Sequence, residues 1–194
     1  MPLERTPEQS VFAAVDFESA GVIRGGTDTP IQIGMAVMPG LDLTRVEPFV
    51  SYLHTDQPVT WQAGQVHGIT TEDLKGAPVF SSLWPEVKSR LGGRIVVAHG
   101  AGTEKRYLRA FPMHGFGPWL DTLVLARRFW PGVRDYSLET LIQAGGLSAE
   151  LEQACPGRRF HDALFDCYAS LILLRHIVTQ AGLAEVPMVR WLKG

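Results

Sequence analysis

Two acidic residues, Asp16 and Glu18, end an otherwise apolar segment that begins at Val11. On a strand, residues i and i+2 project from the same face and lie about 7 Å apart along the chain. Two such carboxylates repel each other and are costly to desolvate unless a cation lies between them. Oxygen ligands of this kind suit Mg²⁺ or Mn²⁺. The pair therefore predicts either a divalent-metal site or a strand that ends in solvated acids.

A second pair, His161 and Asp166, stands at the start of a long apolar stretch, residues 163–178. Five residues of a regular helix turn about 500°, which leaves the two side chains about 140° apart. They converge only if His161 lies on the loop that enters the helix and Asp166 lies one turn inside. The apolar neighbours predict a buried helix, in which Asp166 needs a cation or a hydrogen-bond partner. The alternative is an Asp on one polar stripe at the surface.

A third acid, Glu104, follows a predicted strand end and the small-residue turn of residues 99–103. From the start of a helix there, its carboxylate can point back over the strand ends where Asp16 and Glu18 emerge. The alternative is an acid that is favourably placed in the first turn of a helix.

These acids need a framework that brings their segments together. Hydrophobic periodicity and turn residues predict strands at 11–17, 31–37, 46–53 and 94–98. The predicted helices are 78–91, 103–111, one capped at 121 or 122 and running to 130, one capped at 137 and ending at 145–146, and 163–178. An antiparallel meander followed by alternating helices and strands is typical of a mixed α/β sheet with helices on its faces. We expect residues 1–194 to form a single domain with a core at about 11–178.

Composition narrows the class of protein. The formal net charge of -2 over 194 residues excludes a strongly basic coat protein, but not an enzyme that handles phosphates through bound metal. Two cysteines, Cys155 and Cys167, make no disulfide framework. No window approaches the roughly 18 apolar residues of a membrane helix, and the first ten residues lack the apolar region of a signal peptide. We therefore expect a cytoplasmic protein without a membrane partner.

In chain order, these segments resemble the motifs of the DEDDh 3′–5′ exonucleases, the family of the polymerase III proofreading (epsilon) subunit and ribonuclease T. The resembling segments are Asp16-Phe17-Glu18-Ser19-Ala20-Gly21, Val66-His67-Gly68-Ile69-Thr70, Ile95-Val96-Val97-Ala98-His99, Asp121-Thr122-Leu123, Tyr136-Ser137-Leu138-Glu139-Thr140-Leu141 and His161-Asp162-Ala163-Leu164-Phe165-Asp166. The resemblance extends from Val11 to about Ile177. It implies an RNase H-like fold with a mixed five-stranded sheet and helices on both faces.

The resemblance also implies a chemistry. Two Mg²⁺ or Mn²⁺ ions would be held by Asp16, Glu18, Glu104 and Asp166, and His161 would be the general base. The expected reaction is hydrolysis of the terminal phosphodiester at the 3′ end of DNA or RNA, which releases nucleoside 5′-monophosphates. Two ions about 4 Å apart stabilise both the attacking and the leaving oxygen, and a histidine takes the proton from the attacking water. Whether the substrate is DNA or RNA, and single- or double-stranded, stays open.

The second motif departs from the family pattern. The family has His-Asn-Ala-x-Phe-Asp, whereas residues 99–104 read His-Gly-Ala-Gly-Thr-Glu. The fourth acid is therefore Glu104, one methylene longer than Asp, and it can still ligate a hard cation directly or through water. We expect an active enzyme, because an inactive member of the family would be expected to carry a neutral residue in place of this acid.

Four residues are expected to touch the substrate. The resemblance places His67 beside the terminal nucleotide, or alternatively in a structural turn, and Phe17 under the last base or in the core. Ser19 belongs to the first motif, and Arg106 is a candidate for the nucleic-acid backbone. The other basic candidates, with a solvated surface as the alternative, are Lys105, Arg109, Arg127, Arg128, Arg134, Arg158 and Arg159.

Two other functions stay open beside a stand-alone exonuclease. One is a proofreading subunit that associates with a polymerase. The other is a nucleic-acid-binding module in which the altered second motif abolishes metal binding. A homodimer is also an open possibility, since several members of the family dimerise.

Overall fold

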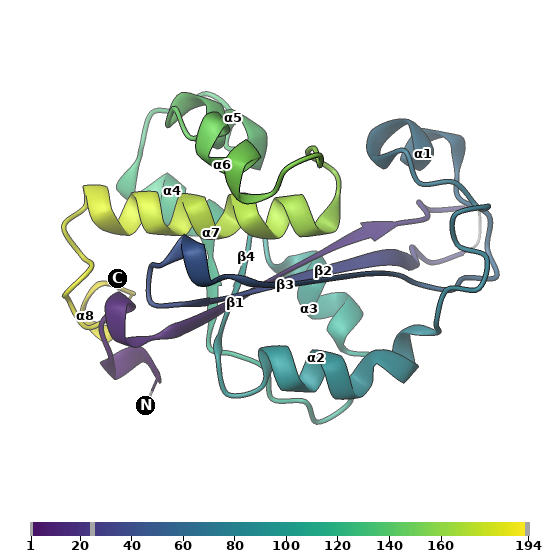
Figure 1. The fold of residues 1–194 in the computed structure, drawn as a ribbon, viewed down its shortest axis with the longest axis horizontal. Coiled ribbons are helices and arrows are strands. Elements are labelled where there is room, and N and C mark those ends of the chain that lie inside the picture. Colours follow the sequence, from purple (N-terminus) through teal and green to yellow (C-terminus); the bar gives the residue numbers. More distant parts are fainter. Residues whose placement is uncertain (1, 24–25, 193–194) are drawn as a thin grey trace.

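The computed structural model describes residues 2–23 and 26–192. Within them, five strands form one sheet in the order β3-β2-β1-β4-β5. The strands are β1 (Val11–Ser19), β2 (Pro30–Pro39), β3 (Glu47–Tyr52), β4 (Ile95–Ala98) and β5 (Trp119–Asp121). This is the mixed five-stranded sheet that the resemblance implied (Figure 1).

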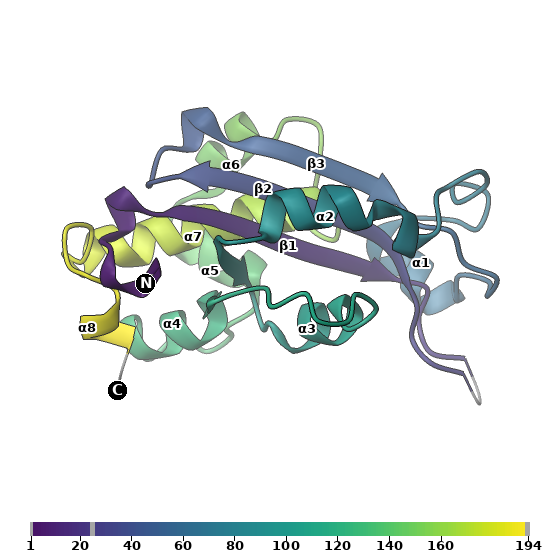
Figure 2. The same ribbon diagram turned by 90° about the horizontal axis from the view of Figure 1, so that it is seen from below.

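Helices cover both faces of the sheet, as expected (Figures 1 and 2). On one face lie α2 (Trp84–Leu91) and α3 (Gly102–Leu108). On the other lie α4 (Thr122–Phe129), α5 (Leu138–Ala144), α6 (Ser148–Ala154) and the long α7 (Ala163–Gln180). The short α1 (Trp61–His67) lies beyond the end of β1, and α8 (Val189–Leu192) lies near the N-terminus.

Strand pairing brings several strand ends to one edge of the sheet. β2 pairs antiparallel with both β1 and β3, which confirms the predicted meander. β4 pairs parallel with β1, and β5 pairs parallel with β4. Parallel neighbours require crossover connections, and their carboxyl ends meet at the same edge. The ends of β1, β4 and β5 therefore lie together, which is where the acids predicted from the sequence emerge.

The structure adds elements that periodicity did not predict, namely α1, α6, β5 and the four-residue α8. β5 has three residues, and α1 and α6 have seven each, so all are too short to establish a hydrophobic period. The helix predicted over 78–91 is instead a 3₁₀ turn, Phe80–Leu83, followed by α2. Pro85 lies in the first turn of α2, where a missing N–H costs no helical hydrogen bond.

Alternation along β1 divides the core between the two faces. Phe12 and Ala14 belong to the apolar cluster under α7, whereas Val15 belongs to the cluster with α2 and α3. Successive residues of a strand alternate between its faces, so Asp16 and Glu18 continue the α7 side. The register of β1 thus decides that both acids face the start of α7.

The two ends of the described chain lie against each other. The N–H of Met188 donates to the carbonyl of Arg5 at 3.1 Å, which ties the turn before α8 to the N-terminal 3₁₀ turns. In the part of the chain that the structure describes, no helix combines the length and the apolar character needed to cross a membrane.

Candidate active site

The strand β1 places two acids at its carboxyl end. Glu18 is 8% exposed, and Asp16 is partly buried. Their neighbours across the sheet are Gly34 and Gln32 of β2, which lie opposite Asp16 and Glu18 respectively. These two neighbours on β2 determine how closely α7 approaches the acids.

Gly34 and Gln32 dock the first residue of α7 onto the sheet. A Cβ atom at Gly34 would lie 2.3 Å from the carbonyl oxygen of Ala163, so only glycine admits the helix backbone at this distance. The side-chain oxygen of Gln32 accepts the N–H of Ala163 at 2.9 Å, which satisfies a donor that the helix itself leaves free. The start of α7 is therefore fixed directly above Asp16 and Glu18.

His161 and Asp166 meet because a loop residue and a helix residue face the same point. His161 lies in the loop before α7 with a φ of 66°, a left-handed conformation that is uncommon for any residue but glycine. Its N–H donates to Oδ2 of Asp166 at 3.2 Å, while Asp162 caps the helix by accepting from Leu164 and Phe165. Ligand atoms of Glu18, His161 and Asp166 all lie within 4.8 Å of one another.

Glu104 reaches the same edge from α3. It is 4% exposed and lies in the first turn of α3, which follows the end of β4. Its turn is held by Asp121, whose carboxylate accepts the N–H groups of Gly100 at 2.9 Å, Ala101 at 2.9 Å and Leu123 at 3.0 Å. Asp121 therefore has a structural role at the end of β5, and both of its oxygens are occupied.

Burial raises the pKa values of all four acids, and repulsion from neighbouring carboxylates adds to it. Burial, and then repulsion from Asp166, Glu18 and Glu104, raises the pKa of Asp16 well above its ordinary value. Burial with the nearby Asp166 and Asp162 carboxylates raises the pKa of Glu18 to about 8. Burial is also the main cause that raises the pKa values of Glu104 and Asp166, each to about 7. Four carboxyl groups are thus gathered in a site where their charges are poorly compensated.

The donor set fits a hard divalent cation. Oε2 of Glu104 and Oδ1 of Asp166 are both buried, and neither has a hydrogen-bond partner among the described residues. A buried carboxylate oxygen without a donor or cation is costly. A cation of the Mg²⁺ or Mn²⁺ class would use these oxygens and remove the repulsion between the acids.

Phe17 and His67 are buried and engaged with other protein groups. Phe17 packs edge-on against Phe80 and Tyr107 at ring-centroid distances of 5.5 and 5.3 Å, on the face of β1 opposite the acids. Nδ1 of His67 accepts the N–H of Ile69 at 2.9 Å, so Nε2 is the donor to the carbonyl of Ser19 at 3.0 Å. Burial lowers the pKa of His67, which is consistent with a neutral ring.

Ser19 and Arg106 lie around the rim. Ser19 follows an irregularity in the pairing of β1 and β2 and is partly exposed. Arg106 is exposed on α3, with its guanidinium 3.4 Å from Oδ2 of Asp28. The structure brings ligand atoms of Glu18, His161 and Asp166 to within 4.8 Å of one another and places Asp16 close enough to Glu18, Glu104 and Asp166 to be repelled by them. It leaves Arg106 in a salt bridge outside that group.

Sequence reasoning missed three residues that position the acids: Gln32, Gly34 and Asp121. Gln32 and Gly34 are the polar and the smallest residue of a strand that is otherwise apolar from 31 to 38, and this was the signal available. Asp121 is one of the two candidate caps of α4 that the sequence offers, but its bonds to the turn before α3 depend on the pairing of β4 with β5, which no local pattern reveals.

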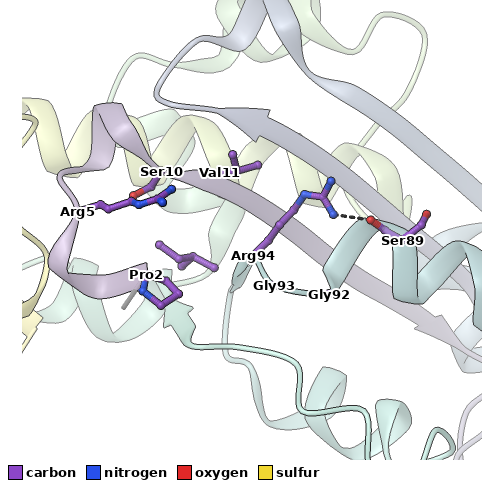
Figure 3. A pocket seen from close by; sticks show the side chains of 9 residues that line it. Pro2, Arg5, Ser10, Val11, Ser89, Gly92, Gly93 and Arg94 are labelled. Carbon is purple, nitrogen blue, oxygen red and sulfur yellow. Dashed lines mark hydrogen bonds between the residues drawn. The ribbon is translucent and has the colours of Figure 1, made fainter.

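A cavity of about 640 Å³ lies at the opposite end of β1 (Figure 3). It is lined where β1 and β4 begin, and Arg5 and Arg94 face it. The nitrogen Nη1 of Arg94 donates to the backbone carbonyls of Ser89 and Arg90. Seven residues of strand, about 23 Å, separate Val11 from Glu18. This cavity is therefore separate from the cluster of acids.

The chain matches known proteins over nearly its whole length. Residues 13–174 match the RNase T family of exonucleases. Exodeoxyribonuclease 10 of Escherichia coli (strain K12) is 32% identical over 168 residues, which is 87% of this chain and 69% of that protein. The PolC-type DNA polymerase III of Thermotoga maritima is 28% identical over 143 residues, which cover 71% of this chain but only 10% of the polymerase.

A solved structure shares the fold. Exonuclease X in complex with 5′ overhanging duplex DNA superposes with a TM-score of 0.71 at 28% identity, and the match covers 92% of this chain and 98% of that one. The agreement in topology confirms the fold class that the motifs implied.

Proposed function

Since the chain belongs to the DEDDh family of 3′–5′ exonucleases, which have the RNase H-like fold, we propose that it removes nucleoside 5′-monophosphates from the 3′ end of DNA or RNA with two bound Mg²⁺ or Mn²⁺ ions. Residues 1–194 act in this proposal as one exonuclease domain. DNA is the substrate to test first, because Exonuclease X is described in complex with duplex DNA.

One observation carries the proposal: four acids from β1, α3 and α7 converge, and two of their buried oxygens have no partner among the described residues. Asp16, Glu18, Glu104 and Asp166 would hold the ions. When bound, divalent cations would supply the positive charge that lets a phosphodiester approach these acids and that stabilises the attacking and leaving oxygens.

His161 is the proposed general base. Its ring is exposed at the rim, and no hydrogen bond to that ring is seen from any residue that the structure describes. Its ring nitrogens are therefore free to accept the proton of an attacking water. The backbone bond from His161 to Asp166 holds the imidazole within 4.8 Å of the carboxylates of Glu18 and Asp166.

The four residues expected to contact the substrate differ in their exposure to solvent. Ser19 and Arg106, at the rim, would contact the terminal nucleotide and the backbone. Phe17 and His67 would act from beneath: Phe17 supports the strand that carries the acids, and His67 fixes the carbonyl of Ser19. For these two residues the proposal therefore takes the structural alternatives, in which Phe17 belongs to the core and His67 to a structural turn.

Association with a polymerase is the second candidate. The similarity to a PolC-type polymerase favours it, because the matched segment is one tenth of a much longer replication protein. Co-purification with a replicative polymerase, and a gain in degradation rate on adding it, would support a proofreading role.

The experiment uses 3′- and 5′-labelled oligonucleotides of DNA and RNA, single- and double-stranded, with Mg²⁺, Mn²⁺ or EDTA. We expect mononucleotides from the 3′ end with either ion and no product in EDTA. A matched variant, Asp166→Asn, should be inactive. Cleavage of closed circular single strands at a comparable rate would contradict the proposal.

A further inference from the structure

Beside the acids lies a groove of about 490 Å³ that the mechanism above does not use. It is lined by His67, Pro156, Gly157, Arg158, Arg159 and Asp162. We propose that Arg159 binds a phosphate of the substrate strand in this groove, namely the phosphate next to the one that is hydrolysed. The inference rests on the proposed exonuclease function and assigns a phosphate subsite to it.

The groove joins the two segments that flank the acids. On one side, His67 at the end of α1 is bonded to the carbonyl of Ser19, which follows Glu18 directly. On the other side, Arg159 precedes His161 by two residues, so their Cα atoms lie within about 7 Å. A strand whose terminal phosphodiester lies at the acids therefore has its next phosphate within reach of this groove.

Charge distinguishes Arg159 from its neighbour. Arg158 is paired with Asp162, with Nη1 at 2.5 Å from Oδ2, so its charge is compensated. Arg159 is exposed, and within residues 2–23 and 26–192 its guanidinium has no ion-pair partner. His67 does not compete for a phosphate, because both of its ring nitrogens are already bonded to the protein. The free positive charge in this groove is that of Arg159.

The guanidinium of Arg159 lies against Gly68. Gly68 caps α1 with a φ of 79°, and a Cβ atom built there would lie 2.7 Å from Nη2 of Arg159. The guanidinium thus rests directly on the glycine backbone at the edge of the groove. A planar guanidinium that is unpaired offers the fork of donors that matches phosphate oxygens.

The test compares two substrates. A single-stranded DNA oligonucleotide carries the second phosphate, whereas the p-nitrophenyl ester of thymidine 5′-phosphate has a single phosphodiester and lacks it. We expect Arg159→Ala to lower the ratio of kcat/KM on the oligonucleotide to kcat/KM on the ester about tenfold. Arg159→Lys should recover part of the ratio, because it keeps the charge but not the fork. Arg45→Ala, an exposed arginine in the turn between β2 and β3, is the matched control and should leave the ratio unchanged.

Binding gives a readout that does not depend on turnover. With Ca²⁺ in place of Mg²⁺, fluorescence anisotropy of a labelled oligonucleotide should show a Kd about tenfold higher for Arg159→Ala. The slope of log Kd against log salt concentration should fall by about 0.7, the value for one phosphate contact on a single strand.

Two results would overturn the inference: an unchanged Kd, or an unchanged ratio, whether kcat/KM is unaffected on both substrates or falls equally on both. An equal fall on both would mean that Arg159 acts by holding the His161 loop. If the wild-type chain hydrolyses neither substrate, the proposed function fails, and the anisotropy arm still decides whether Arg159 binds the strand.

Discussion

Two acid-bearing regions at the same edge of the sheet are built in opposite ways. At the end of β5, Asp121 accepts three backbone N–H groups, and both of its oxygens are occupied. At the start of α7, Asp166 accepts one N–H on Oδ2, while its buried Oδ1 has no partner among the described residues. Both are acids beside a helix start, but only Asp166 keeps capacity for a further ligand.

The histidines of the two regions repeat the contrast. His99, next to Asp121, contacts the hydroxyl of Thr122 with Nδ1 at 2.9 Å and the carbonyl of Tyr136 with Nε2 at 2.8 Å. His161, next to Asp166, exposes its ring at the rim. Polar groups that have all their hydrogen-bond partners stabilise the fold. Buried polar groups that lack a partner, and residues with strained backbones, are typical of functional sites. Substitutions at Asp166 and His161 should therefore affect activity, whereas substitution of Asp121 should affect mainly stability.

The largest effect is expected at Asp166. Asp166→Asn keeps the shape and an acceptor for the N–H of His161 but removes a charge from the proposed metal site. Exonuclease activity should fall about 10⁴-fold, because charge balance and metal geometry are lost together. Labelled-oligonucleotide degradation measures it. Asp135→Asn, an exposed acid in a hydrogen-bonded turn, should keep activity. Comparable activity in the two variants would contradict the assignment of Asp166 to the proposed metal site.

Removal of the proposed base should affect turnover rather than binding. His161→Ala should lower kcat by about 10²–10⁴-fold and leave KM and Mn²⁺ affinity nearly intact. Steady-state kinetics and calorimetry measure the two quantities. A loss confined to KM would show that His161 binds substrate and does not take the proton.

Glu104 tests the departure from the family motif. Glu104→Gln should lose activity at low Mg²⁺ and regain part of it at high Mg²⁺, because it weakens the site that holds an ion. Glu104→Asp shortens the arm by one methylene, so its activity reports whether the turn held by Asp121 has moved outward to accommodate Glu. Full activity of Glu104→Gln at every Mg²⁺ concentration would exclude it as a ligand, and the occupied oxygens of Asp121 make that residue a poor replacement.

Substitution of Asp121 should lower stability more than activity. Asp121→Asn replaces an acceptor oxygen with a donor beside the N–H of Gly100 or Ala101, which should destabilise the fold by about 1–2 kcal/mol. Thermal unfolding should show a Tm lower by a few degrees. Activity at saturating Mg²⁺ should fall less than tenfold. A loss as large as that of Asp166→Asn would place Asp121 among the metal-holding residues.

The last prediction concerns the dependence of stability on pH in EDTA and not activity. The pKa of Glu18 is raised to about 8 in the folded chain and is about 4.5 when unfolded. The unfolded state therefore loses this proton first as pH rises, so the contribution of Glu18 to stability is fully present below pH 4.5 and is lost progressively up to about pH 8. The Tm in EDTA should fall over this range, less steeply in Glu18→Gln, and Mg²⁺ should raise it at pH 8. A flat profile would contradict the raised pKa that burial, with repulsion from Asp166 and Asp162, gives Glu18.

The sequence alone was sufficient for the main elements and for the acids. The alternation of β1 predicted that Asp16 and Glu18 share a face. Of the two candidate caps of α4, Asp121 and Thr122, the structure has Asp121, and Ser137 caps α5 as predicted. These features depend on contacts a few residues apart, which local patterns encode. Short elements such as β5 and α1 were not predicted, because three to seven residues are held by tertiary contacts rather than by their own periodicity.

Only the tertiary structure decided which polar groups keep an unpaired atom that can bind a ligand. Asp121, Asp162 and Asp166 have the same residue type, as do Arg158 and Arg159. Folding pairs Arg158 with Asp162 and covers Asp121 with backbone N–H groups, but leaves Oδ1 of Asp166 unsatisfied. The approach of α7 to Gly34 brings that oxygen to β1 across more than 130 residues of chain. Residue type and spacing determine which groups can bind a metal or a phosphate, whereas the packing of distant strands and helices determines which of them remain free to do so.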